Sequence, residues 1–435
     1  MRWRGFEKRF TRRQFSCVPK PLKRLFPPRL DKKGQRWRNK GLQSVQHLTC
    51  NGTIHIRRTI YWSAEEGADC RIDRWLGIAD NSVSVAAREL CSRATISGGS
   101  FRKSAENLER LGQVRVSSNR LREIVEAEGQ RALKARDKGL ISPAWDVSDC
   151  KRDGDGRSHV IVGVDGVMVP LVTKSEKDKR RKNRRICGRK RIRRSDRAVG
   201  RHRPKERPKR YRGADGPYKE FKIVAFYDRA NEHQHAAGTA GNHEALGRLM
   251  RREAAKLKFG QADEKTSATD GAEWIRRQLD TKLPMLDEKT LDFYHFSEHI
   301  WSGANGCFGQ GSGRAVEFAA ELLHIAKHDG PTALLARLPE EQKRHRGRGK
   351  RKLLKEVIQY IARRFDMCDY PKFIARGWPI GSGPTEAFCK TLTRRLKGSG
   401  MRWDCPNAEG IMALAAMDQS GQWKAYWNLQ STLVA

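Results

Sequence analysis

The chain has 435 residues, with 89 Lys and Arg against 50 Asp and Glu, a formal net charge of +39 and 37% hydrophobic residues. This length suffices for two or three domains that each bury a core, and the charge favours a polyanionic partner. No apolar run reaches the roughly 18 to 20 residues that span a membrane, and no apolar segment follows the basic N-terminus as in a signal peptide, so we expect a cytoplasmic protein that binds nucleic acid.

Ten cysteines are present, and none of them forms a C-x-x-C pair. In a cytoplasmic chain we expect these cysteines to be reduced thiols rather than disulfides. Without paired spacing they also do not indicate a zinc ribbon. We therefore expect no structural metal.

The N-terminal third is basic and then helical in pattern. Residues 1–45 are rich in Arg without a sustained period, which is typical of a basic arm that lies along phosphates, and equally of a solvated tail. Residues 53–62 alternate as a strand does. Residues 82–138 carry a helical period, so region 46–145 is predicted to be mainly helical.

Part of this region resembles a DNA-binding motif. The segment SFRKSAENLERLGQVRVSSNRLREIVEAEGQRAL predicts two helices joined by a short turn, with Ser117 or Ser118 capping the second. A helix-turn-helix would place Asn119, Arg120 and Arg122 in a major groove. A helical pair that only packs explains the pattern equally well.

The middle of the chain predicts an α/β core. HVIVGVDGVMVPLV (159–172) is the most strand-like run, and residues 220–228 form a second strand. Between them, residues 174–212 hold twenty-one Lys and Arg against four Asp and Glu, which predicts a disordered basic loop. A helix is expected at 243–258, and a strand, turn and helix at both 266–279 and 290–300.

The C-terminal third is helical in pattern. Residues 314–376 predict an all-α insertion broken at Gly330-Pro331, at Leu338-Pro339 and at the basic HRGRGKRK. A last helix is expected within 381–403, where Pro384 suits the first turn and Gly398 a stop. On it, Phe388, Leu392 and Leu396 recur on one face and Glu386, Lys390 and Arg394 on another.

Three acidic residues are candidates for a metal site, and each has a structural alternative. Asp165 lies in an apolar strand, but Asp-Gly also favours a hairpin turn. Asp270 follows a strand, but it also suits a helix N-cap with Glu273 completing a capping box. Glu386 heads a row of cations, which an i to i+4 ion pair on a solvated face also explains.

A short histidine motif favours another enzyme class. His295, Glu298 and His299 spell H-x-x-E-H, the zinc-binding pattern of inverzincin peptidases. A peptidase has no need of a net charge of +39, so this is a minor alternative. A basic DNA-binding protein without catalysis is the other.

The sequence around these residues resembles a known family. GSGPTEAFCKTLTRRLKGSGMRW, VDGVMVP, TDGAEWI and DFYH are similar, in order, to the motifs of the DDE transposases of bacterial insertion sequences, in particular the ISKra group, which is related to the Mutator transposases. The similarity runs from roughly residue 46 to 418. It implies a ribonuclease H-like core with an all-α insertion, in which Asp165, Asp270 and Glu386 are catalytic and bind Mg²⁺ or Mn²⁺.

The charge, the helical patterns and the resemblance together give the expected partners and domains. Asp292 and His295 match an accessory Asp-x-x-His signature, Lys390, Arg394 and Arg402 are expected to contact DNA, and a homo-oligomer is expected on double-stranded transposon ends and target. The expected domains are a basic arm (1–45), a helical DNA-binding region (46–145), the first part of the core (146–300), a helical insertion (301–378), a C-terminal catalytic helix (379–420) and a tail (421–435).

Overall fold

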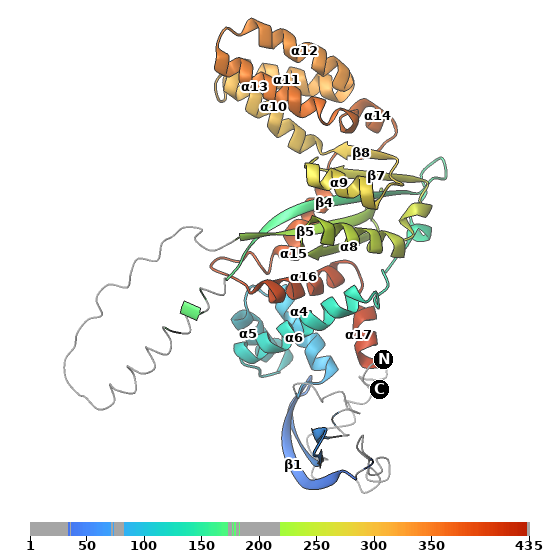
Figure 1. Ribbon diagram of the computed structural model, residues 1–435, viewed down its shortest axis with the longest axis vertical. Helices are drawn as coiled ribbons and strands as arrows, with labels where there is room; N and C mark the ends of the chain where they lie inside the picture. The colour runs from blue at the N-terminus through green and yellow to red at the C-terminus, as the bar shows by residue number, and fades with distance from the viewer. Residues whose placement is uncertain are drawn as a thin grey trace, which may run out of the picture. The chain divides into compact units, whose positions relative to one another are not determined.

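The computed structural model describes residues 34, 36–70, 73, 82–172, 176, 178, 179, 182 and 218–432 (Figure 1). These residues fall into two compact units. The first contains the N-terminal residues up to Ile141, residues 413–415 and the C-terminal residues from Gln422, and the second contains Ser142–Met412 with Ala416–Gly421. None of the described helices has the length and apolar character needed to cross a membrane.

The first unit combines an antiparallel sheet with helices. The sheet has the order β1-β2-β3, from strands β1 (Arg38–Thr49), β2 (Gly52–Ser63) and β3 (Gly67–Asp69). The helices are α4 (Val85–Ser97), α5 (Phe101–Gly112), α6 (Ser118–Asp137) and α17 (Trp423–Thr432). The region predicted to be mainly helical therefore also holds a sheet, and β1 begins inside the range expected to be an arm.

A buried charge cluster joins the helices of this unit. Glu128 of α6 is fully buried and accepts hydrogen bonds from Arg88 of α4 (3.1 Å), from Arg131 (3.0 Å) and from the Tyr426 hydroxyl of α17 (2.6 Å). A buried carboxylate is tolerated when such partners satisfy it. The predicted tail at 421–435 is thus largely a helix that packs in the core of the first unit.

The second unit is built on a five-stranded mixed sheet of order β6-β5-β4-β7-β8. Its strands are β4 (His159–Pro170), β5 (Tyr218–Asp228), β6 (Gln234–Thr239), β7 (Glu264–Thr269) and β8 (Glu288–Leu291). β4 pairs antiparallel with β5 and parallel with β7, while β5–β6 is antiparallel and β7–β8 parallel. The α/β prediction is confirmed. The basic segment 174–212 lies outside the described residues except at 176, 178, 179 and 182.

The two faces of β4 bury different partners. Val160, Val162 and Val164 share one hydrophobic core with α8 (His243–Lys256) and α9 (Glu273–Lys282). Because side chains alternate along a strand, Asp165 belongs to the opposite face. That face is covered by α15 (Gly383–Thr393), while α16 (Cys405–Gln419) bonds to β6 through Glu409 and Thr239 (2.7 Å). Short 3₁₀ turns occupy Val147–Asp149 and Phe259–Gln261.

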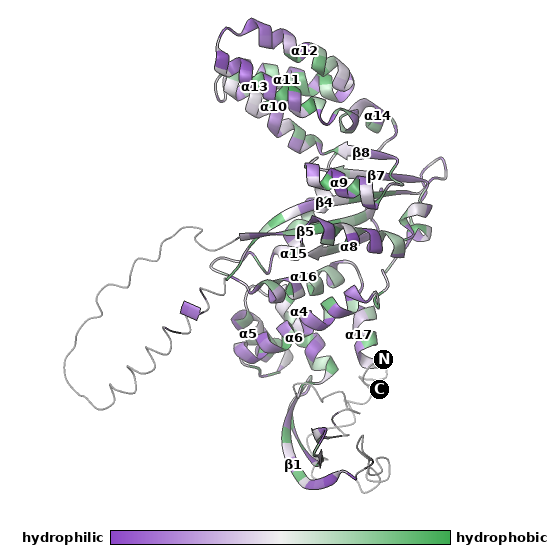
Figure 2. Cartoon of the chain, viewed as in Figure 1, coloured by the Kyte–Doolittle hydropathy of each residue, from purple (hydrophilic) through white to green (hydrophobic). Residues whose placement is uncertain are grey.

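A helical subdomain stands between β8 and α15, as the all-α insertion predicts. It consists of α10 (Phe293–Phe308), α11 (Gly313–His328), α12 (Gly330–Arg344), α13 (Arg348–Ala362), a 3₁₀ turn (Phe365–Met367) and α14 (Tyr370–Ala375). These helices share one hydrophobic core, and α11, α12 and α13 each carry hydrophobic and hydrophilic residues (Figure 2). The expected start at residue 301 falls inside α10, and Pro339 lies within α12 instead of breaking it.

Candidate active site

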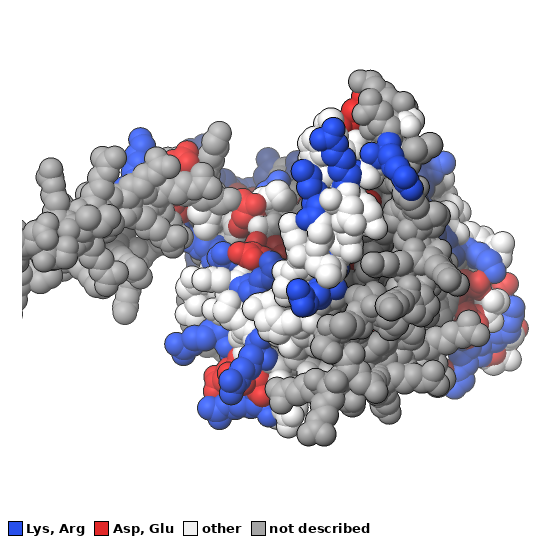
Figure 3. Space-filling model, turned by 90° about the horizontal axis from the view of Figure 1, so that it is seen from below, with Lys and Arg blue, Asp and Glu red and all other residues white. Residues whose placement is uncertain are grey.

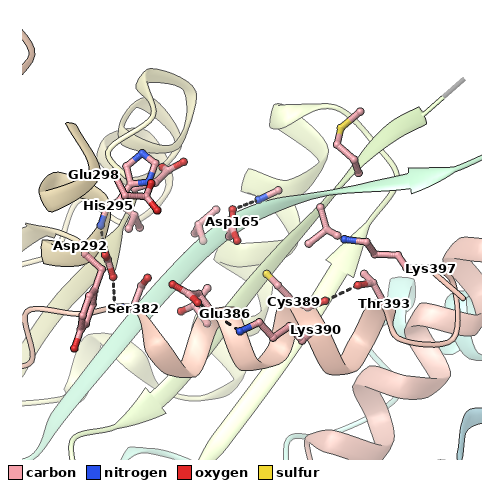
Figure 4. Close-up of a pocket in the computed structure, with 18 of the residues that line it drawn as sticks. Asp165, Asp292, His295, Glu298, Ser382, Glu386, Cys389, Lys390, Thr393 and Lys397 are labelled. Atoms are coloured by element: carbon pink, nitrogen blue, oxygen red, sulfur yellow. Dashed lines mark hydrogen bonds and ion pairs between the residues drawn. The ribbon is translucent and has the colours of Figure 1, made fainter. Parts of the chain in front are cut away.

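A cavity of about 660 Å³ opens between β4, the end of β7, the start of α10 and α15. It is lined by both acidic and basic side chains, namely Asp165, Asp270, Asp292, Glu298, Glu386, Lys390, Arg394 and Lys397. In Figure 4, Glu386 and Cys389 of α15 lie beside Asp165 of β4, and Lys390 and Lys397 follow along the chain. The three predicted catalytic acids thus line one cavity, although up to 221 residues separate them in the sequence.

Asp165 lies within a continuous strand. β4 pairs with β5 in unbroken register from Val160↔Asp228 to Pro170↔Tyr218, so the hairpin alternative at Asp165-Gly166 is wrong. Burial raises the pKa of Asp165, and the charges of Asp270 and Glu220 raise it further, while hydrogen bonds from the Gly166 N–H (2.6 Å) and the Cys389 thiol lower it. The Gly166 N–H, the Cys389 thiol and the carboxylates of Asp270 and Glu220 are therefore all near enough to act on this carboxylate.

Asp270 occupies the turn between β7 and α9. Its carboxylate accepts a hydrogen bond from the Ala272 N–H (2.8 Å), whereas the N-cap of α9 is Ala272 and has no side-chain cap. The capping-box alternative is therefore wrong. Gly271 has a φ of +68°, and its carbonyl accepts a hydrogen bond from the Arg364 guanidinium (3.0 Å). This hydrogen bond ties the turn that carries Asp270 to the helical subdomain, to which Arg364 belongs.

Glu386 stands in the first turn of α15. Phe388, Leu392 and Leu396 are buried, as the predicted face requires, and the Glu386 side chain is 53% exposed. It pairs with Lys390 at 3.7 Å, so the expected ion pair is present inside the cavity. α15 approaches β4 closely at Gly163, where a Cβ atom would lie 1.7 Å from the Thr385 hydroxyl oxygen.

Asp292 of the Asp-x-x-His signature connects three segments of the cavity wall by hydrogen bonds. Asp292 is 2% exposed, caps α10 through the His295 N–H (2.8 Å), and accepts a second hydrogen bond from the Ser382 N–H at the start of α15. Its own N–H donates to the Thr269 carbonyl (2.7 Å). Asp292 therefore ties together the three segments that carry Asp270, His295 and Glu386, which is a structural role.

The two histidines of the peptidase-like motif lie next to each other, with ring centroids 5.3 Å apart. His295 lines the acidic cavity and lies 3.6 Å from Glu298. His299 stacks on Tyr360, with ring centroids 3.8 Å apart, and burial lowers its pKa. No third His, Cys, Asp or Glu among the described residues completes a metal-binding group with these two histidines.

The oxygen donors of the cavity suit a hard divalent cation. The charge of Asp270 raises the pKa of Asp165, and a cation shared by the two carboxylates would reverse that effect. Among the described residues, however, no three His, Cys, Asp or Glu side chains stand close enough together to hold one ion. The effect of Asp270 on the pKa of Asp165 shows only that these two carboxylates are near enough to interact.

Two groups beside Asp165, Glu220 and Cys389, were not among the predicted site residues. A Cβ atom at Gly166 would lie 2.3 Å from a carboxylate oxygen of Glu220. Glycine at this position therefore leaves space for the Glu220 side chain and does not form a turn. Cys389 follows Glu386 by three residues and therefore shares its side of α15. Spacing along the helix was the one signal that could have identified it.

The predicted DNA contacts lie in several places. On α6, Ser117 is the cap, Asn119 and Arg122 are exposed, and Arg120 pairs with Glu123 (3.3 Å). Lys390 and Arg394 line the cavity, whereas Arg402 pairs with Glu176 (2.9 Å). Figure 3 shows Lys and Arg beside Asp and Glu on the described part of one face. The structure contains the predicted helical pair but does not distinguish DNA binding from packing.

Comparison with known proteins gives one family. A model of an uncharacterised protein family, UPF0236, matches residues 23–182. This is less than half of the chain and includes β1 to β4 with Asp165, but neither Asp270 nor Glu386. No curated protein matches the sequence.

Proposed function

We propose that this protein is a transposase that binds insertion-sequence ends and catalyses metal-dependent cleavage and transfer of DNA strands. The observation that carries the proposal is that Asp165, Asp270 and Glu386 line one cavity although they come from a central strand, a turn and a late helix. Acids that converge from separate elements are what a divalent-metal phosphoryl-transfer site needs.

We assign the second unit to the ribonuclease H-like class. The assignment is supported by the strand order β6-β5-β4-β7-β8, in which an antiparallel group precedes two parallel strands. The first acid lies on the central strand β4, the second follows β7, and the third is on α15 across the face of the sheet. The helical subdomain is then an insertion before the third acid.

In this proposal the residues of the cavity have distinct tasks. Asp165 and Asp270, with Glu386, would hold Mg²⁺ or Mn²⁺, which when bound polarises the phosphate and activates water or a 3′-hydroxyl. The Cys389 thiol and the Gly166 N–H fix the orientation of Asp165. Lys390 and Arg394 offer cations to the phosphates of the strand, because they line the same cavity.

The proposed partner of the protein is double-stranded DNA. The exposed face of α6, with Asn119, Arg120 and Arg122, would contact duplex DNA, and the net charge of +39 favours binding along its phosphates. We also propose that the protein acts on DNA as a homo-oligomer in the cytoplasm.

A nicking assay tests the function. Purified protein is incubated with Mg²⁺ or Mn²⁺ and DNA that carries the element's own ends, beside Asp165→Asn, Asp270→Asn and Glu386→Gln variants. Glu317→Gln, an exposed acid on α11 outside the cavity, is the matched control. We expect metal-dependent nicking in the wild type and the control, and at least about a hundredfold loss in the three variants, the range of lost electrostatic stabilisation.

Two results would contradict the proposal. Specific DNA binding without metal-dependent nicking would indicate a non-catalytic DNA-binding protein. Zinc-dependent peptide cleavage that is lost in His299→Ala would indicate the peptidase.

A further inference from the structure

One aromatic ring of α10 lies in the cavity instead of the core. Phe296 is fully buried, and Phe293 packs edge-on against Tyr370 with ring centroids 5.0 Å apart. Tyr294, between them in sequence, is 76% exposed and lines the acidic cavity. Residues 293 and 296 share the core side of the helix, so the helical period itself turns residue 294 outward.

The start of the helix that carries this ring is anchored, although the ring itself is exposed. Its helix begins at the buried Asp292, and the Phe293 N–H donates to the Ile380 carbonyl (2.9 Å). A Cβ atom at Gly381 would lie 3.7 and 3.8 Å from two ring carbons of Tyr294, so the ring rests beside the backbone of that glycine. The side chain is thus supported on one side and open on the other.

The rest of the cavity suits a nucleic acid strand. Lys390, Arg394 and Lys397 line it and are exposed, and the Lys390 side chain is 80% exposed. Proteins bind unpaired nucleotides in grooves that contain both an exposed aromatic ring and cations, because the ring stacks on a base while the cations contact phosphates. The volume, about 660 Å³, is within the roughly 300–1,000 Å³ of pockets that enclose small molecules, a class that includes a nucleotide.

We propose that Tyr294 is a stacking platform for an unpaired nucleobase of the DNA strand whose phosphate lies over the acids. The cavity then takes a frayed or single-stranded strand end in preference to a closed duplex. This inference rests on the proposed function, because it assumes that the strand in the cavity is DNA. It adds a binding subsite and a preference for unpaired substrate.

Fluorescence of 2-aminopurine tests the platform without cleavage. The full-length protein, with Ca²⁺ replacing Mg²⁺ so that the acids are neutralised without cleavage, is titrated into two matched DNAs, a closed duplex and a fork whose 2-aminopurine is unpaired. Wild type, Tyr294→Phe and Tyr294→Ala are compared with Tyr218→Ala, which removes an exposed tyrosine outside the cavity. Stacking on the ring quenches the fluorophore, so the signal reports the contact as well as the affinity.

The expected result is selective. Tyr294→Ala should weaken binding of the fork by roughly 5- to 150-fold, the range measured for one lost base stack, and abolish the quenching. Binding of the closed duplex should be unchanged, and Tyr294→Phe and Tyr218→Ala should behave as wild type. Retention by Phe identifies the ring, not the hydroxyl, as the contact.

Other outcomes overturn the inference. Equal weakening on both DNAs, unchanged quenching in Tyr294→Ala, or a Phe variant as weak as Ala would each exclude a stacking platform. If the wild type nicks DNA in the assay above but shows one of these results, the platform alone fails. If the wild type neither nicks nor binds DNA, the proposed function itself fails.

Discussion

At the scale of single residues, the cavity depends on a close approach between a strand and a helix. Gly163 stands two positions before Asp165 on the same face of β4, and α15 reaches that face at Thr385, next to Glu386. Any side chain at position 163 would occupy the place of the Thr385 hydroxyl. Glycine is therefore needed here for space and not for its backbone freedom.

We predict that Gly163→Ala displaces α15 and separates Glu386 from Asp165. Overpacking of this kind costs about 1–3 kcal/mol of the free energy of unfolding, and nicking should fall with it. Gly313→Ala is the control, because a Cβ atom there meets nothing within 4 Å. Chemical denaturation of both variants measures the difference, and an alanine at 163 that leaves stability and nicking intact would disprove the close approach.

At the scale of elements, the helical subdomain contacts the turn that carries Asp270. Arg364 follows α13, donates to the Gly271 carbonyl at 3.0 Å and lies over the Tyr360 ring at 4.2 Å. Arg276 of α9 makes a parallel contact, to Asp366 at 2.6 Å. The subdomain is thus also a support for the turn that carries Asp270.

Arg364→Lys should therefore impair nicking without removing a catalytic group. Lysine cannot reproduce both the planar stack and the directed hydrogen bond. We expect the rate constant to fall by roughly tenfold, as for the loss of one positioning hydrogen bond, with DNA affinity unchanged. The neighbouring Arg363→Lys is the control. A weaker affinity with an unchanged rate constant would mean that Arg364 binds DNA instead.

A buried ion pair between α8 and β6 gives the core a defined acid sensitivity. Glu253 and His235 are 2% and 1% exposed and lie 3.1 Å apart. Burial alone raises the pKa of Glu253, but the hydrogen bond and charge of His235, with Lys256 and Arg252, lower it to about 2. The carboxylate therefore stays charged in the folded protein well below the ordinary glutamate pKa of about 4.3.

The stabilisation by Glu253 is complete above the unfolded pKa and disappears as the pH falls through the folded pKa. At pH 7 we expect Glu253→Gln to lower the free energy of unfolding by roughly 3 kcal/mol, since each pKa unit is worth about 1.4 kcal/mol. The difference from wild type should shrink between pH 4.5 and about 2. Urea denaturation at stepped pH measures it, and a difference independent of pH would refute the charged pair.

At the scale of the whole molecule, strong periodicity explains what the sequence predicted. β4 and β5 were expected close to their observed ranges, and the insertion was expected to be helical as a whole without ranges for its single helices. β6 (QHAAGT) was missed because Ala and Gly have little strand propensity and only pairing with β5 orders it. β1 was missed because its exposed residues are mostly polar.

The candidate site was only partly predictable. Asp165, Asp270 and Glu386 were chosen with the help of a resemblance. That they line one cavity depends on the tertiary fold, which the sequence around each residue does not reveal. Two structural alternatives proposed from local sequence were wrong, a hairpin at Asp165-Gly166 and a capping box at Asp270. Gly166 makes space for Glu220, and Gly271 adopts a positive φ in the turn after Asp270. Arg364 had no sequence signal, whereas Tyr294 lies within the DFYH motif but was not among the candidate site residues.

We expect the basic segment 174–212 to make DNA binding by the whole chain strongly dependent on salt. Residues 174–212 carry twenty-one Lys and Arg, and each phosphate contact contributes about −0.9 to the slope of log K against log salt. Replacing the segment by a neutral linker of equal length should flatten that slope. Filter binding at several salt concentrations measures it, and an unchanged slope would show that the segment does not contact DNA.

The central claim is that Asp165, Asp270 and Glu386 act together as one metal site. Calorimetric titration of Mn²⁺ into the protein bound to its end DNA tests it most directly, with the three acid variants and Glu317→Gln beside the wild type. The account predicts saturable Mn²⁺ binding in the wild type and in Glu317→Gln, and its loss or at least tenfold weakening in the three variants, as for loss of a ligand or its supporting groups. Equal Mn²⁺ binding by Asp165→Asn, Asp270→Asn and the wild type would contradict it.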